Sequence, residues 1–296
     1  MDRVLERTVH QGFAGVEVGD ENFTDLDYAD DVSLFAVMLE ILQLSLDILN
    51  TEASTFGLEV NWLKTKVQFV GDAPDPPAAV AICNDQVDVV ESFVYLGSLV
   101  HNTGSSEPEI RRRIEIARSK MNELNRNIWR SSISLRTKLR LYRVYILPVL
   151  LYGCETWTTT HALMDKLGAF DRWCRRRIMR VSYLRHMTNQ EVMQRTRIVP
   201  PVPGIITETR LRWFGHVARS DTKEDHCRAM SAAINIRPNK LWKRRPGRPR
   251  ATWLRSLEDD LKPLNFGLHT AWKKAQNRTG WREVMDTVKL RQESCH

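Results

Sequence analysis

Residues 25–36 read DLDYADDVSLFA, and two adjacent carboxylates, Asp30 and Asp31, lie at the centre of this stretch. The segment 32–35 is rich in strand-forming residues, so we expect the acids at the tip of a hairpin. Two close like charges repel each other, and desolvation adds to that cost. A divalent cation removes the cost because Mg²⁺ prefers carboxylate oxygens as ligands. The dipeptide alone favours an ordinary turn, and the downstream sequence favours a metal-binding hairpin.

The tetrapeptide at 28–31, Tyr-Ala-Asp-Asp, resembles the metal-binding hairpin in the palm of non-LTR (LINE-type) retrotransposon reverse transcriptases. Three further stretches follow in the order of that family. FGLEVNWLKTKVQFV (56–70) is similar to the element beside the active site, and VVESFVYLGSLV (89–100) is similar to the primer-grip hairpin. Residues 205–256 resemble the C-terminal region of insect-type elements, with RWFGHVAR at 212–219 and GRPR at 247–250. Four ordered matches over most of the chain are far more specific than one tetrapeptide.

The resemblance implies an RNA-directed DNA polymerase that uses two Mg²⁺ (or Mn²⁺) ions for nucleotidyl transfer. Asp30 would be the principal metal ligand and Asp31 an auxiliary one. Tyr28 and Ala29 would shape the tip near the primer. The implied partners are an RNA template and a DNA primer, and the implied location is intracellular, in the nucleus.

The resemblance also assigns residues that hold the substrates. Lys64 would steady the phosphates of the incoming nucleotide, although its position alone fits a solvated lysine at the start of a strand equally well. The primer would be held by Tyr95, Leu96 and Gly97.

The chain departs from the family at its beginning. By the resemblance, Met1 falls near the end of the helix that precedes the hairpin, so we expect the fingers and the first palm strand, with its own metal-binding Asp, to be missing from this sequence. A two-metal site needs carboxylates from more than one strand, and Asp25 and Asp27 lie in the same hairpin arm as the motif. We therefore expect a truncated element copy, or an incomplete gene model, that does not polymerise by itself.

Charge is distributed unevenly along the chain, whose net charge is +8. Residues 1–106 contain 4 Lys/Arg against 18 Asp/Glu, and residues 107–296 contain 40 against 18. Such a basic region favours a polyanionic partner. The side chains that we expect to contact nucleic acid are Arg111, Arg112, Arg118, Arg175, Arg176, Lys243, Arg244, Arg245, Arg248 and Arg250. A non-catalytic RNA- or DNA-binding protein is therefore the main alternative, and an intron maturase-like protein is a weaker one.

The hydrophobic pattern predicts an α+β fold. The resemblance divides it into three parts: a partial palm at 1–104, a helical thumb and connector at 105–200, and a basic C-terminal region at 201–296. The first part is expected to hold a helix at 37–56, with Met38 and Phe56 on its apolar face, a strand at 67–70 and a hairpin of 79–83 with 86–90.

The second part begins with a helix whose apolar residues recur at spacings of three and four. Its expected core face is Ile110, Ile114, Ala117, Met121, Leu124 and Ile128. Ser106 and Glu109 predict a capping box, and a second helix at 135–151 is expected to kink at Pro148. The Pro/Gly-rich residues 200–204 predict a linker.

Other classes find little support. Five cysteines without a C-x₂-C pair predict free thiols, and His216, His226 and Cys227 lack the spacing of a structural zinc site. No apolar run approaches the ~20 residues of a membrane span, so we expect no membrane partner. No nucleophile elbow, P-loop or dinucleotide fingerprint occurs.

Overall fold

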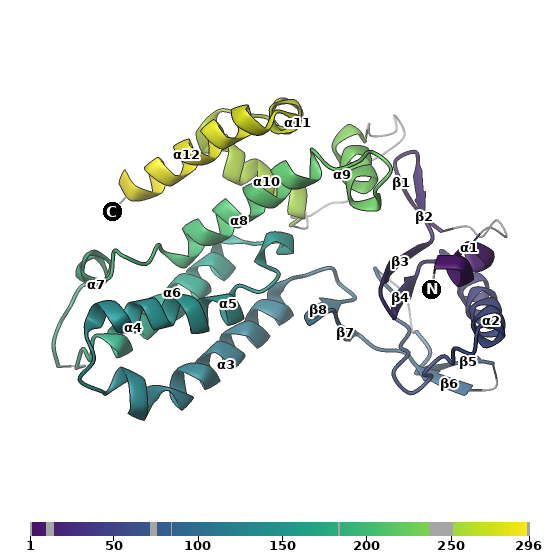
Figure 1. Ribbon diagram of the computed structural model, residues 1–296, viewed down its shortest axis with the longest axis horizontal. Coiled ribbons are helices and arrows are strands. Elements are labelled where there is room, and N and C mark those ends of the chain that lie inside the picture. The colour runs from purple at the N-terminus through teal and green to yellow at the C-terminus, as the bar shows by residue number, and fades with distance from the viewer. Residues whose placement is uncertain are drawn as a thin grey trace. The chain divides into compact units, whose positions relative to one another are not determined.

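The computed structural model describes residues 2–9, 15–71, 76–83, 85–182, 184–236 and 251–294. Helices and short antiparallel strand pairs are both present, so the predicted α+β class is confirmed. The chain forms two compact units (Figure 1). The first combines Met1–Gly104 with Asp221–Arg244, and the second combines Ser105–Ser220 with Arg245–His296. The C-terminal third is thus shared between the two units.

The first unit contains all of the strands that the structure describes. They pair in sequence order as antiparallel hairpins: β1 (Val16–Val18) with β2 (Glu21–Phe23), β3 (Asp25–Tyr28) with β4 (Asp31–Leu34), β5 (Ala79–Ile82) with β6 (Asp85–Asp88), and β7 (Ser92–Tyr95) with β8 (Ser98–His101). Within the described part of the chain, each hairpin remains a separate two-stranded sheet. The strand expected at 67–70 is limited to a single bridge between Val67 and Val89.

Helices α1 (Asp2–Val9) and α2 (Leu39–Thr55) pack together, and α9 (Asp225–Asn235) lies against β1 and β2. Leu46, Leu49 and Ala53 of α2 are buried, but Met38 and Phe56 are 57% and 46% exposed. Both are cap residues outside the helix proper, so they do not follow its buried face. The core of this unit is small, and many large apolar side chains on its hairpins remain exposed.

The second unit is helical. Its elements are α3 (Glu107–Glu123), η1 (Asn125–Trp129), α4 (Leu135–Leu141), η2 (Tyr142–Ile146), α5 (Leu147–Leu150), η3 (Cys154–Thr156), α6 (His161–Ile178), α7 (Asn189–Arg195), α8 (Val202–Val217), α10 (Trp253–Leu261), η4 (Lys262–Leu264), α11 (Leu268–Gln276) and α12 (Arg278–Ser294). The helix predicted at 135–151 is interrupted by the π-helical segment η2, which ends two residues before Pro148. Proline cannot donate the next helical hydrogen bond, which accounts for the break.

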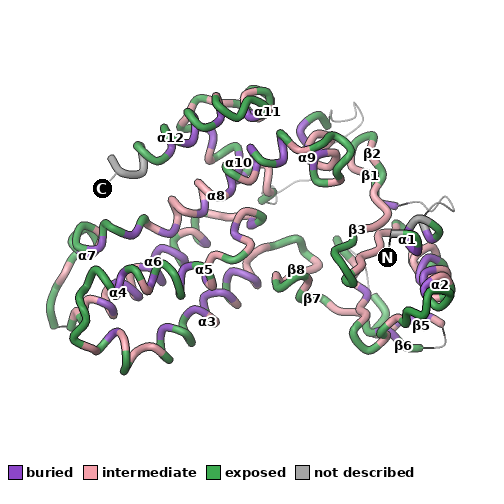
Figure 2. The backbone as a smooth tube through the Cα atoms, viewed as in Figure 1, coloured by how far each residue is buried: buried purple, intermediate pink, exposed green. Residues whose placement is uncertain are grey.

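The predicted core face is confirmed for Ile110, Ile114, Ala117 and Met121, which are buried. Leu124 and Ile128 lie beyond the end of α3 and are only partly buried. Figure 2 shows the buried positions along α3. The predicted capping box is wrong. Ser106 Oγ instead accepts a hydrogen bond from the amide of Thr158 at 2.9 Å. A capping box does occur at the start of α7, between Thr188 and Glu191.

The predicted linker at 200–204 is wrong for its second half, because Val202 to Gly204 form the first turn of helix α8. Val202 is fully buried in the core of the second unit. Pro203 lies in the first turn, where a missing amide hydrogen costs nothing. The motif at 212–219 therefore lies at the C-terminal end of a helix that starts at Val202.

Candidate functional site

The predicted metal-binding residues lie at the tip of the β3–β4 hairpin. Tyr28 and Asp31 form the last strand pair, so Ala29 and Asp30 make a two-residue turn. Asp30 and Asp31 are exposed, and Tyr28 is 67% exposed. In the part of the chain that the structure describes, neither carboxylate has a hydrogen-bond or ion-pair partner. Both are therefore available to a ligand.

The turn holds Ala29 in a strained conformation, with φ at +60°. An L-residue in this left-handed region costs roughly 1–2 kcal/mol, which glycine avoids. The equivalent first turn position of the β1–β2 hairpin is Gly19, with φ at +64°. Strain of this kind is often retained at functional sites. The hairpin tip is thus less stable than the same turn with glycine.

The donor set at the tip fits one hydrated Mg²⁺. Mg²⁺ keeps several waters and is commonly held by one or two carboxylates together with substrate phosphates. A pair of metal ions needs more ligands, and the described residues contain no cluster of three His, Cys, Asp or Glu side chains that could hold a metal. Asp25, two residues before Asp27 in β3, instead accepts a hydrogen bond from Thr24. Asp30 and Asp31 alone do not fit a two-metal centre.

The predicted substrate-holding residues lie on separate elements. Lys64 is exposed in a turn, and its backbone amide donates a hydrogen bond to Oδ1 of Asn61. Leu96 and Gly97 form the turn of the β7–β8 hairpin, with φ at +46° and +80°, and Tyr95 precedes them. No strand pairing among the described residues joins this hairpin to β3–β4. The roles of these residues stay predictions.

Two predicted nucleic-acid contacts line a groove between α3 and α6. This groove has a volume of about 760 Å³, and Arg111, Arg118 and Lys166 contribute basic side chains beside Phe170 and Trp173. Its charge is largely neutralised. Arg111 and Lys166 both pair with Glu107, and Arg118 pairs with Glu115.

Arg112 and Arg175 are engaged with the protein itself. Arg112 donates to the carboxylate of Glu109 at 2.7 Å. The expectation that Arg175 contacts nucleic acid is corrected, because its side chain is fully buried. Its Nε donates to Asp171 at 2.8 Å, and its other nitrogens bond carbonyl and hydroxyl oxygens of residues 196–200. Asp171 also accepts from Tyr142, so this arginine belongs to a buried structural network.

Arg176 lies at a second cavity, which we call the arginine pocket. It measures about 460 Å³ and is lined by Asn125, Arg130, Arg176, Arg177, Arg180, Val181 and Ser182. The sequence predicted only Arg176 of these as a contact. The spacing of 176, 177 and 180 at the end of a helix was a usable signal, whereas Arg130 is distant in sequence and only the fold places it there.

The remaining predicted contacts, Lys243, Arg244, Arg245, Arg248 and Arg250, lie outside the described residues. Among the helices that the structure describes, none has the length and apolar composition needed to cross a membrane.

Comparison with known proteins gives one informative similarity. No protein-family model matches the chain. The chain is 27% identical over 279 residues to an uncharacterised transposon-derived protein of Caenorhabditis elegans. The alignment covers 91% of this chain and 98% of that protein.

Proposed function

We propose that this chain derives from a retrotransposon reverse transcriptase and binds nucleic acid, without polymerising DNA by itself. The observation that carries the proposal is the hairpin tip, where Asp30 and Asp31 are exposed and have no partner among the described residues. The likeness to a transposon-derived nematode protein supports a transposable-element origin. The order of the four sequence stretches supports a polymerase within that class.

In the parent reaction, a divalent metal ion would lower the barrier by stabilising charge on the primer oxygen and the nucleotide phosphates. Asp30 and Asp31 would hold one such ion. The described residues place no further carboxylate with them, so the second ion lacks ligands. We therefore expect no nucleotidyl transfer by this chain alone.

Primer extension tests this proposal. The purified chain is incubated with an RNA template, an annealed DNA primer, deoxynucleotides and Mg²⁺ or Mn²⁺. We expect no extension above background. Extension that is lost in Asp30→Asn, and retained in the matched control Asp27→Asn, would contradict the proposal that the chain is inactive by itself.

The basic C-terminal part of the chain favours a function that needs no metal. The region from 107 onward has a large excess of basic residues, which suits phosphate contacts. We expect RNA or duplex binding that weakens steeply with salt and is unchanged in the double variant Asp30→Asn/Asp31→Asn. Absence of binding at ~50 mM salt, where phosphate contacts are strong, would contradict this part of the proposal.

A further inference from the structure

The arginine pocket concentrates positive charge without an acidic partner. Its lining holds four arginines and no Asp or Glu. Within the residues that the structure describes, no ion pair joins Arg130, Arg176, Arg177 or Arg180 to a carboxylate. The neighbouring groove between α3 and α6 differs, because its cations are paired with Glu107 and Glu115.

Two cations converge on the same backbone oxygens beside this pocket. The ammonium of Lys138 donates to the carbonyls of Trp129 and Ser131 at 2.9 and 2.8 Å. Arg180 donates to the same two carbonyls at 3.2 and 2.6 Å. Burial, and then the nearby charge of Arg180, lower the pKa of Lys138. Two cations are thus crowded around the same two carbonyl oxygens.

The chain conformation at Arg180 is also strained. Helix α6 ends in a Schellman motif, in which the amide of Arg180 bonds the carbonyl of Arg177 and the amide of Val181 bonds that of Arg176. Arg180 occupies the left-handed position of this motif, with φ at +55°, where glycine is preferred. Arg180, which lines the pocket, therefore occupies a position where glycine is the favoured residue.

The end of a helix explains only part of this cluster. The C-terminal macrodipole is equivalent to about half a negative elementary charge, which is small against four guanidinium groups. Each guanidinium carries five N–H donors in a fork that matches phosphate oxygens. The hydrogen bonds of Arg176 go to the carbonyl of Met187 and to Asn189, and Arg177 bonds Asn125. Donors thus remain on both side chains.

We propose that the arginine pocket binds a phosphate group of a nucleic-acid strand. The phosphate oxygens would accept hydrogen bonds from Arg130, Arg176 and Arg177. A phosphate is favoured over a single carboxylate because it offers more oxygens to several forks at once. The assignment of this phosphate to a nucleic-acid strand rests on the proposed function.

Two measurements on the full chain test this inference. Arg130→Gln is the first variant, because the side chain of Arg130 is exposed and has no partner in the described structure. Arg177→Gln is the second. The matched control is Arg143→Gln, which removes the same charge from an exposed position outside the pocket lining.

The first measurement uses inorganic phosphate, at about 10 mM against chloride of equal ionic strength, and follows the melting temperature. We expect phosphate to raise the melting temperature of the wild type and of Arg143→Gln, but not of Arg130→Gln. The second uses a labelled single-stranded RNA. We expect Arg130→Gln and Arg177→Gln each to weaken binding about tenfold and to reduce the salt slope by about 1, because one phosphate contact is lost.

The outcomes separate this inference from the proposed function. If RNA binds but the pocket variants have the same RNA affinity as Arg143→Gln, phosphate binding by the arginine pocket is overturned and nucleic-acid binding by the chain stands. If phosphate stabilises the wild type but RNA does not bind, the bound phosphate does not come from a nucleic-acid strand. The proposed function is then overturned as well. Equal competition by polyglutamate and by phosphate would overturn the phosphate assignment and point to an acidic peptide.

Discussion

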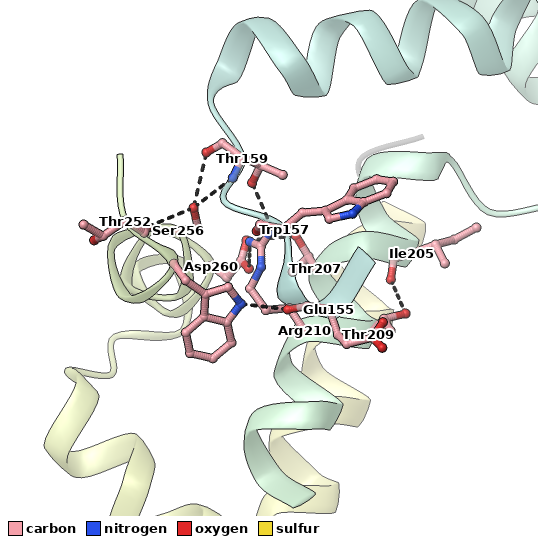
Figure 3. Close-up of polar contacts among 11 residues, drawn as sticks. Glu155, Trp157, Thr159, Ile205, Thr207, Thr209, Arg210, Thr252, Ser256 and Asp260 are labelled. Atoms are coloured by element: carbon pink, nitrogen blue, oxygen red, sulfur yellow. Dashed lines mark hydrogen bonds and ion pairs between the residues drawn. The ribbon is translucent and has the colours of Figure 1, made fainter. Parts of the chain in front are cut away.

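Arg210 Nη1 donates to Asp260 Oδ2 at 2.6 Å, and this ion pair joins α8 to α10 (Figure 3). The two side chains are 1% and 13% exposed. Arg210 also donates to the carbonyl of Trp157 and the hydroxyl of Thr159, and Asp260 accepts from Thr207. Burial raises the pKa of Asp260, and Arg210 opposes that rise. The pair therefore holds the C-terminal helices on the rest of the second unit.

Removing the acid from this pair should destabilise the protein strongly. Asp260→Ala leaves the guanidinium of Arg210 buried without its counter-ion, which typically costs about 4 kcal/mol. Urea unfolding measures the change. The adjacent Asp259 is the matched control, because its pair with Lys262 is largely exposed. Asp259→Ala should cost less than about 1 kcal/mol, and equal losses in both variants would contradict the role of the buried pair.

Gly215 allows close contact between α8 and α12. A Cβ atom at this position would lie 2.2 Å from Nε1 of Trp281, which donates to the carbonyl of Leu211. Gly215→Ala should therefore cost about 1–3 kcal/mol by overpacking. Gly280→Ala is the control, because its Cβ would meet atoms only at 3.8 Å or beyond. We expect that control to change the free energy of unfolding by less than about 0.5 kcal/mol.

Local patterns predicted local structure well. The spacing of Ile110, Ile114, Ala117 and Met121 identified the buried face of α3, because helical periodicity decides which side chains meet the core. The hairpin of β5 and β6 followed from two short apolar runs around a turn. The stretch 212–219 resembles a family motif, and the structure gives part of it a packing role through Gly215.

Interactions between distant residues were not predictable. The sequence predicted Arg175 to lie on the surface, as its neighbour Arg176 was predicted to do. Its side chain instead donates to carbonyl oxygens of residues 196–200, which lie about twenty residues further along the chain. Nothing near Ser106 indicated that its hydroxyl would bond Thr158. The arginine pocket depends on Arg130 meeting the end of α6, a relationship that only the folded chain supplies.

The hairpin acids should be dispensable for stability. Asp30 and Asp31 are exposed and unpaired among the described residues, so Asp30→Asn should change the free energy of unfolding by less than about 0.5 kcal/mol. The same substitution should weaken Mn²⁺ binding, measured by the broadening of nuclear resonances near the ion. Asp27→Asn serves as the control, since Asp27 lies in β3 before the turn. Unchanged Mn²⁺ binding in Asp30→Asn would contradict the assignment of this tip as a metal ligand.

The strain at Ala29 should be relieved by glycine. Ala29→Gly places the residue without a Cβ at φ +60°, so we expect the protein to be stabilised by about 1 kcal/mol. Gly19 provides the reverse test, because it holds the equivalent turn position at φ +64° and a Cβ there would meet atoms only at ordinary contact distance. Gly19→Ala should therefore destabilise the protein by a similar amount. Urea unfolding of both variants measures the two changes, and a loss of stability in Ala29→Gly would contradict the assignment of strain to Ala29.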